Sequence, residues 1–334
     1  MMKKTLVALA ATAVAGGAFA QATLTGTIAY AYSQKTLSSG ATTGGLGLDT
    51  SALNFAIAEE IEGMGKLTAG FGISAGDKDA ATYGRDSFLK LDMGGMGSVK
   101  WDNVYAASWL AGAVASPGSV AYCGFSKGDC ASGVGMFSTF GYQDDLQYAL
   151  KLSDAVSISA THTQPSTGAG GGSAAGSQYI YSGGTGTAQR YNTYSATYAS
   201  GPLTITGGYR TYDGADQSTK NSNYRHRAAA SFDMGVAKIG GGYEATATTY
   251  GDVTTDTVVG VSVPAGALTL SAQFGNRTIS GSSTTTSDTS YSGSIYGAKY
   301  ALSKRTSLDA TYINTQNSGT SNASYFLTRL AHTF

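Results

Sequence analysis

Charged side chains recur at every second residue in several stretches of this chain, and the spacing suggests a surface that attracts ions. Arg225 and Arg227 stand two residues apart next to a run of alanines, and Lys100 and Asp102 repeat the spacing. Successive side chains of an extended strand point to opposite faces, so residues two apart share a face. Charged groups gathered on one face steer ions and polar solutes. The spacing therefore indicates a binding or transport surface built on β-strands.

The charged face can be assigned once the apolar residues of each stretch are placed on the other face. Nearly all strand charges then fall opposite the apolar residues. The main candidates for a row that faces water are Lys90, Lys100, Asp102, Arg210, Arg225, Arg227, Arg277 and Arg329. The same face receives Lys151, Lys238, Glu244, Lys299 and Asp309. The exceptions, which lie near stretch ends where a side chain can reach water, are Glu59, Arg85 and Arg190.

Hydrolysis is the main alternative chemistry, and it generally needs a histidine beside a serine or a carboxylate. The chain has three histidines, His162, His226 and His332, and all three fall on the apolar face near a stretch end. We therefore expect no catalytic residues and no enzyme. The loop carboxylates show no ordered spacing of calcium ligands, so neither a metal nor a cofactor is expected.

The charged residues lie in sixteen stretches of 9 to 13 residues that alternate apolar with polar or small residues. The stretches are 22–33, 51–62, 65–76, 85–93, 97–105, 143–152, 155–164, 190–200, 202–212, 223–234, 236–248, 254–264, 267–278, 290–302, 305–315 and 323–334. Connections of 1 to 3 residues alternate with connections of 5 to 37 residues. Tight turns at one end and long loops at the other are typical of bacterial outer-membrane barrels. The rhythm predicts an all-β fold, a 16-stranded antiparallel transmembrane β-barrel with long external loops.

Such a barrel explains why the two faces differ. In hydrocarbon every strand N–H and C=O needs a partner, so strands cross a membrane only as a closed cylinder. A lysine or arginine that faced lipid at mid-depth would cost about 2–4 kcal/mol, so the charged face belongs inside. At about 16 strands a barrel is wide enough to hold an aqueous channel. Passive diffusion of ions and small hydrophilic solutes is therefore the expected activity.

The chain begins with features of an export signal. Lys3 and Lys4 precede an apolar segment, Leu6 to Val14, and the small residues Ala18 and Ala20 suit a cleavage site. We expect a signal peptide at 1–20 and one barrel domain at 21–334. In an exported chain the only two cysteines, Cys123 and Cys130, favour a disulfide over a metal site, because no histidine lies nearby. The formal net charge is zero, which predicts no general attraction to nucleic acid.

The longest connection, Ala106 to Tyr142, is expected to fold into the barrel. Loops of this length in compact domains are usually functional or disordered. Trp109, Phe137 and Phe140 make this one too apolar to remain solvated. Folded inward, it would narrow the channel, and whichever of Lys127, Asp129 and Asp144 face the gap would oppose cations of the wall. The alternative is that these loop charges face solvent. Charge at a constriction governs ion selectivity.

Several segments resemble the general porins of Gram-negative bacteria, especially the β-proteobacterial group. They are Leu53 to Leu67 with its acidic pair, Arg85 to Val99 with Asp86, Ser87 and Phe88, and the ending Arg329 to Phe334. The resemblance implies a homotrimer in the outer membrane, in contact with its lipids and lipopolysaccharide, with an infolded third external loop. It also implies that the barrel-assembly machinery reads Phe334. Family members often carry a pore cation at two positions that hold Ala56 and Asn103 here. Two cations that would favour anions are therefore missing, and the resemblance does not by itself predict an anion preference.

A substrate-selective channel remains as the alternative. Arg210, Arg225, Arg227 and Arg277 would form an anion site if they lay at one height. An aromatic track for sugars is weakly supported, because one of only two tryptophans, Trp101, falls on the lipid face.

Overall fold

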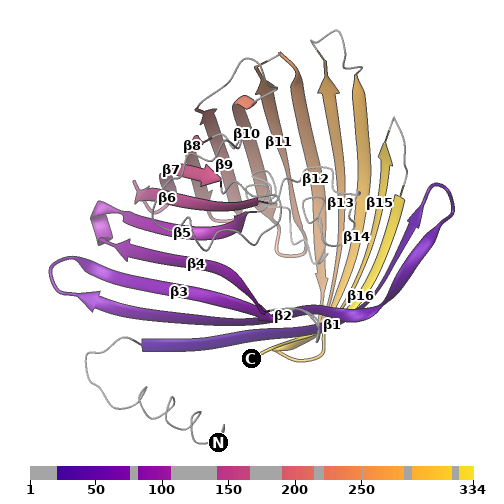
Figure 1. Cartoon of the computed structure of the whole chain (residues 1–334), viewed down its shortest axis with the longest axis horizontal. Helices are drawn as coiled ribbons and strands as arrows, with labels where there is room; N and C mark the ends of the chain where they lie inside the picture. Colours follow the sequence, from indigo (N-terminus) through magenta and orange to yellow (C-terminus); the bar gives the residue numbers. More distant parts are fainter. Residues whose placement is uncertain are drawn as a thin grey trace, which may run out of the picture.

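The chain folds into one closed antiparallel β-barrel of sixteen strands, so the predicted fold class is confirmed (Figure 1). The computed structural model describes residues 21–75, 82–106, 141–165, 190–213, 222–249, 251–281, 288–317 and 323–334. Every strand pairs with its neighbours in sequence, and β1 pairs with β16 to close the barrel. No helix among these residues is long and apolar enough to cross a membrane. The expected signal peptide and residues 107–140 of the long connection lie outside the described residues.

The strand bounds follow the alternating stretches closely. The first half comprises β1 Gln21–Leu37, β2 Thr42–Ile61, β3 Gly65–Ala75, β4 Thr82–Asp92, β5 Ser98–Ala106, β6 Gly141–Lys151, β7 Val156–Pro165 and β8 Tyr191–Ser200, with a short 3₁₀ helix η1 Gly94–Met96. The second half comprises β9 Leu203–Tyr212, β10 Ser222–Asp233, β11 Lys238–Thr248, β12 Val253–Ala265, β13 Leu268–Ser280, β14 Thr289–Ala301, β15 Thr306–Asn317 and β16 Ala323–Thr333. Each of the last fourteen strands begins and ends within three residues of its predicted bounds.

The first connection differs from the prediction. Residues 34–50 were expected to form a loop, but β1 runs to Leu37 and β2 starts at Thr42, so only a short turn joins them. A β-bulge explains the difference: Ala29 pairs with Thr50 and Tyr30 pairs with Leu48, so Asp49 is an extra residue in β2. A bulge reverses the alternation of faces, and glycines nearby remove the contrast between apolar and polar positions. The apolar–polar alternation therefore breaks within residues 34–50, although β1 and β2 continue there.

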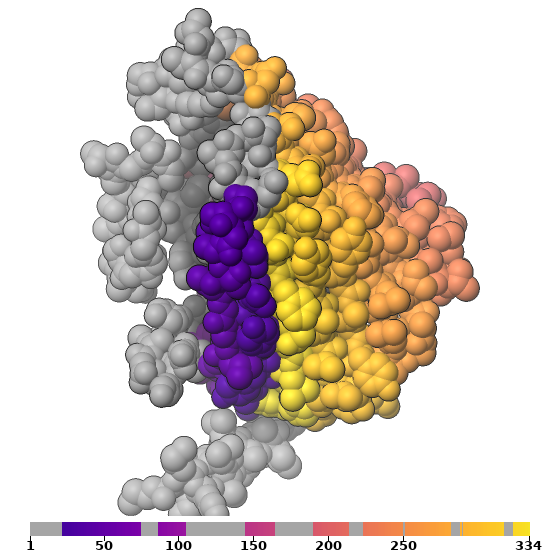
Figure 2. Space-filling model, turned by 90° about the vertical axis from the view of Figure 1, so that its right-hand side faces the viewer, coloured from indigo at the N-terminus to yellow at the C-terminus, as the bar shows by residue number. Residues whose placement is uncertain are grey.

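The barrel closes through a tight contact between the first and last strands. Figure 2 shows β1 in indigo running beside β16 in yellow. The Gly26 N–H donates to the Phe334 carbonyl at 2.9 Å, and the Phe334 N–H donates to the Gly26 carbonyl at 3.0 Å. The Phe334 ring covers Gly26, where a Cβ would lie 2.3 Å from Cζ of the ring and 2.9 Å from the Ala52 carbonyl oxygen. Only glycine fits beneath this ring without a shift.

We expect Gly26→Ala to weaken this seam. The added methyl group must displace the Phe334 ring and crowd the Ala52 carbonyl, and such overpacking costs about 1–3 kcal/mol. Gly45→Ala is the matched control, because a Cβ at Gly45 meets nothing within 4 Å. The yield of heat-modifiable barrel refolded into lipid vesicles measures the effect. Equal yields for the two variants would show that the seam tolerates the methyl group.

Candidate functional site

The two faces of the barrel wall differ as the alternation predicted. Large apolar side chains stand exposed on the outer face, among them Trp101 (52%), Leu270 (47%) and Phe274 (47%). The positions between them carry polar and charged residues, and several of these are buried against one another on the inner face, such as Glu244, Asp256 and Asp309. An apolar outside and an ionic inside match the demands of a bilayer on a barrel that holds water.

A row of four charged residues crosses β10 to β13 on the inner face. Arg227 lies opposite Glu244, Glu244 opposite Asp256, and Asp256 opposite Arg277. Arg277 donates two hydrogen bonds to Asp256, from Nε to Oδ1 at 2.6 Å and from Nη2 to Oδ2 at 2.8 Å. Glu244 forms an ion pair with Arg225, in which Nη1 and Oε1 are 3.5 Å apart. The row thus places two neighbouring carboxylates between arginines.

Arg210, Arg225 and Arg227 gather on β9 and β10, and we call these three residues the arginine cluster. Arg210 is the direct cross-strand neighbour of Arg225. The Arg210 guanidinium lies 3.9 Å from the centre of the Tyr191 ring, and its Nε donates to Thr193 Oγ1 at 2.8 Å. Stacking on an aromatic ring and the hydrogen bond to the Thr193 hydroxyl hold this cation in place. Arg277, the fourth candidate for an anion site, lies on β13, three strands from β10, and is paired with Asp256 of β12.

A second ionic group spans the barrel seam. Arg329 on β16 donates from Nη2 to Asp309 Oδ2 at 2.6 Å and from Nε to the same oxygen at 3.0 Å. Its Nη1 reaches Asp49 Oδ2 at 3.4 Å. Asp309 is 1% exposed. One arginine therefore pairs with two carboxylates, one on β15 and the other in the bulge of β2.

Three of the predicted lysines, on β4, β5 and β6, each pair with a nearby aspartate. Lys100 forms an ion pair with Asp102 on the same strand, and its Nζ lies 5.6 Å from the centre of the Phe88 ring. Lys90 faces Asp92 at 3.5 Å, and both of these side chains are well exposed. Lys151 pairs with Asp154 in the following turn at 3.0 Å, and this hydrogen bond lowers the pKa of Asp154. These pairs continue the alternation of charge along the inner wall.

Two residues given a place in the channel lie on the outer face instead. Asn103 shares its face with Trp101, and its Nδ2 donates to Asp144 Oδ1 at 2.7 Å. Asp144 therefore points away from the channel and does not oppose the cations of the wall. Asn103 also lies on the outer face, so it does not occupy a position from which a cation could line the pore. Ala56 does occupy the inner face, because its neighbours Phe55 and Ile57 point outward.

Other predicted site residues cannot be placed. Lys127, Asp129, Cys123 and Cys130 fall in residues 107–140, outside the described part of the chain. Sequence reasoning also missed partners that the structure reveals. Asp256 lies on the inner face but sits beside a run of valines that hides its phase, and Asp49 is hidden by the bulge.

The histidines lie on the outer face, away from the charged wall. His226 stacks between two tyrosines, with ring centres 6.1 Å from Tyr224 and 5.9 Å from Tyr243. His162 contacts Asn192, with Nδ1 and Oδ1 2.8 Å apart, and His332 contacts Thr306 in the same way at 2.9 Å. In the contacts just given, the partner is an uncharged side chain on the outer face.

A closed barrel of sixteen strands with an apolar outside and a charged inside defines a class of protein, the outer-membrane channels. The chain matches the Gram-negative porin family over residues 5–320, and it belongs to that family. It is therefore an outer-membrane channel for the passive diffusion of solutes. The family predicted from the sequence is confirmed.

Solved structures share this fold at low sequence identity. An anion-selective porin from Comamonas acidovorans is 18% identical, with a TM-score of 0.65 over 94% of this chain and 100% of that one. The trimer form of OmpT from Vibrio cholerae is 12% identical, with a TM-score of 0.66 over 95% and 100%. A variant of the Rh. blastica porin is 14% identical, with a TM-score of 0.56 over 94% and 100%. A comparison with curated protein sequences finds no match.

Proposed function

We propose that the protein is a general diffusion pore that passes ions and small hydrophilic solutes without a dedicated substrate. The inner wall carries this proposal, because its cations and carboxylates face each other in pairs from Lys100 and Asp102 to Arg329 and Asp309. Paired charges make a wall hydrophilic while leaving little net field to select one solute. The outward histidines supply no base to the channel, which supports a pore without enzymatic activity.

A preference for anions is the second candidate, and the arginine cluster favours it. Three guanidinium groups lie on β9 and β10, and Glu244 is the carboxylate placed among them. A local excess of positive charge concentrates anions near the wall. The similar Comamonas protein is described as anion-selective. The preference would be modest, since the ion pairs elsewhere on the wall balance.

We also infer that the long connection packs inside the barrel against β14 to β16. Ile295, Ile313 and Leu327 belong to the inner face, yet they are 0%, 3% and 2% exposed. The inner wall of a water-filled tube would leave such side chains wet unless another segment covered them. The apolar residues of Ala106 to Tyr142 suit that role. This placement would make Lys127 and Asp129 part of the constriction.

Homotrimer assembly is part of the proposal. One structure with the same fold is described as a trimer form. The expected partners are two further copies of the chain, outer-membrane lipids and lipopolysaccharide, and the barrel-assembly machinery, which would read Phe334. Conductance steps that arrive in groups of three would support the trimer.

Liposome swelling distinguishes a general pore from a selective one. With protein reconstituted into liposomes, we expect uncharged sugars to enter at rates that fall smoothly with size, because the paired wall recognises no particular hydroxyl pattern. Sugars of equal size but different stereochemistry should enter at equal rates. Liposomes without protein are the control. Rapid entry of one stereoisomer and slow entry of the others would favour a selective channel.

A further inference from the structure

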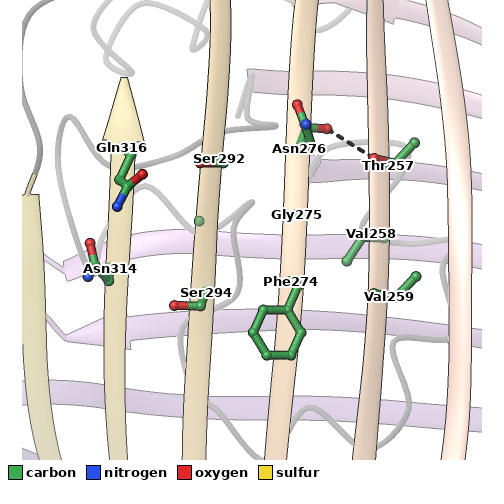
Figure 3. A pocket seen from close by; sticks show the side chains of 11 residues that line it. Thr257, Val258, Val259, Phe274, Gly275, Asn276, Ser292, Ser294, Asn314 and Gln316 are labelled. Atoms are coloured by element: carbon green, nitrogen blue, oxygen red, sulfur yellow. Dashed lines mark hydrogen bonds between the residues drawn. The ribbon is translucent and has the colours of Figure 1, made fainter. Parts of the chain in front are cut away.

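The outer wall carries a polar hollow that the pore does not explain. It lies over β12 to β15 and has a volume of about 460 Å³. Figure 3 shows its side chains on four neighbouring strands. Amides and hydroxyls line it, together with an aromatic ring and two valines: Asn276, Asn314, Gln316, Ser292, Ser294, Thr257, Phe274, Val258 and Val259.

The hollow arises from small residues on one strand. Ser292, Gly293 and Ser294 of β14 leave a trough between Phe274 and Asn276 on β13 and the amides of β15. Tyr296, the next outward residue of β14, meets the Phe274 ring edge-on, with ring centres 6.0 Å apart and planes at 85°. The trough is therefore polar towards the loop ends of the strands and aromatic towards the membrane interior.

The depth of the hollow places it near the outer lipid headgroups. Asn276 and Asn314 lie eight residues from Leu268 and Thr306, the ends of their strands beside the short turns. At about 3.3 Å per residue and a tilt of about 40°, these amides stand about 20 Å above the turns, near the upper edge of an apolar band about 25 Å tall. Uncharged amides in contact with acyl chains would lack hydrogen-bond partners, which is costly. A polar group of a membrane component should satisfy them.

We propose that this hollow binds the sugar headgroup of an outer-leaflet glycolipid. Its chemistry fits a sugar, because side-chain amides and hydroxyls hydrogen-bond to sugar hydroxyl and amide groups, while Phe274 offers an apolar surface for a ring face. No lining residue is charged, so recognition does not run through phosphate. The acyl chains would continue downward over Tyr296 and the exposed apolar side chains beneath it. The site concerns the outer face and is independent of the channel.

Retention of glycolipid by the intact protein tests the proposal. Full-length protein is purified in mild detergent, stripped of lipid, incubated with rough-form lipopolysaccharide and analysed by native mass spectrometry. The double variant Asn276→Leu with Asn314→Leu removes two hydrogen-bonding groups, and retention should fall about tenfold. The control Gln34→Leu with Asn192→Leu removes two outer-face amides elsewhere on the barrel and should retain lipid normally. Ser294→Phe, which fills the trough and leaves the amides, should also lower retention.

The outcomes separate the possible occupants of the hollow. Conductance of each variant verifies that the barrel has folded and leaves the pore function as a separate question. Equal retention by the double variant and its control would overturn the proposal. A change in subunit number with unchanged retention would also overturn it, because the hollow would then be covered by a second copy of the chain.

Discussion

Glu244→Gln is expected to raise the chloride-to-potassium permeability ratio about threefold at low salt. Glu244 of β11 is 3% exposed, lies directly opposite Arg227 of β10 and forms an ion pair with Arg225 of the same strand β10. Glutamine keeps the shape of the side chain but removes its negative charge, so the arginine cluster presents a larger positive field to the channel. A unit charge at about 8 Å in water is worth about 0.5 kcal/mol, with opposite sign for the two ions. The reversal potential in a potassium chloride gradient measures the ratio.

A matched control comes from the outer face. Asp144→Asn removes the same charge, but Asp144 points away from the channel and is bonded to Asn103. Its permeability ratio should match that of the wild type. The effect of Glu244→Gln should also shrink in 1 M salt, where the Debye length falls to about 3 Å. Equal shifts for both variants, or a shift at Glu244 towards cations, would show that the arginine cluster does not face the ion path.

Arg329→Ala is expected to lower the free energy of unfolding by about 3–5 kcal/mol, the largest stability effect we predict. The substitution leaves two carboxylates without their cation, and the Asp309 side chain is only 1% exposed. An uncompensated buried charge is costly because it has lost water and gained no partner. Urea unfolding of the barrel in lipid vesicles, followed by tryptophan fluorescence, measures the loss.

A solvent-exposed ion pair, Lys90 with Asp92, is the comparison for the buried pair of Arg329 with Asp309. Lys90→Ala breaks the pair with Asp92, whose side chains are 39% and 51% exposed, and it should cost no more than about 1 kcal/mol. Adding Asp309→Leu to Arg329→Ala should restore part of the lost stability, since the more deeply buried charge is then gone. If Arg329→Ala and Lys90→Ala were equally mild, the Arg329 group would not stabilise the barrel seam.

The strands could be predicted because their signals are local. Alternation with a period of two and the turn residues between stretches are read over a few positions, and they located fourteen strands to within three residues. The first hairpin failed for an equally local reason: the bulge at Asp49 reversed the phase, and glycines beyond it carried no contrast. A strand in which a bulge shifts the apolar–polar alternation by one residue no longer shows a period of two, so a prediction from that period assigns it to a loop.

The site was only half predictable. Alternation placed Arg225 and Arg227 on the inner face, but their partners depend on the pairing of strands that are distant in sequence. Arg329 and Asp49 are 280 residues apart, and only the closed barrel brings them together. Asn103 shows the opposite error. Its phase, set by Trp101, pointed outward, whereas comparison with a family motif assigned it to the pore.

Single-channel conductance across a planar bilayer tests the central claim most directly, namely that water fills the barrel from end to end. For folded, heat-modifiable protein we predict discrete steps whose size grows in proportion to the conductivity of the bathing salt solution, because ions cross such a pore in bulk-like water. Folded protein that produced no steps, or steps that saturated at low salt, would contradict an open aqueous channel.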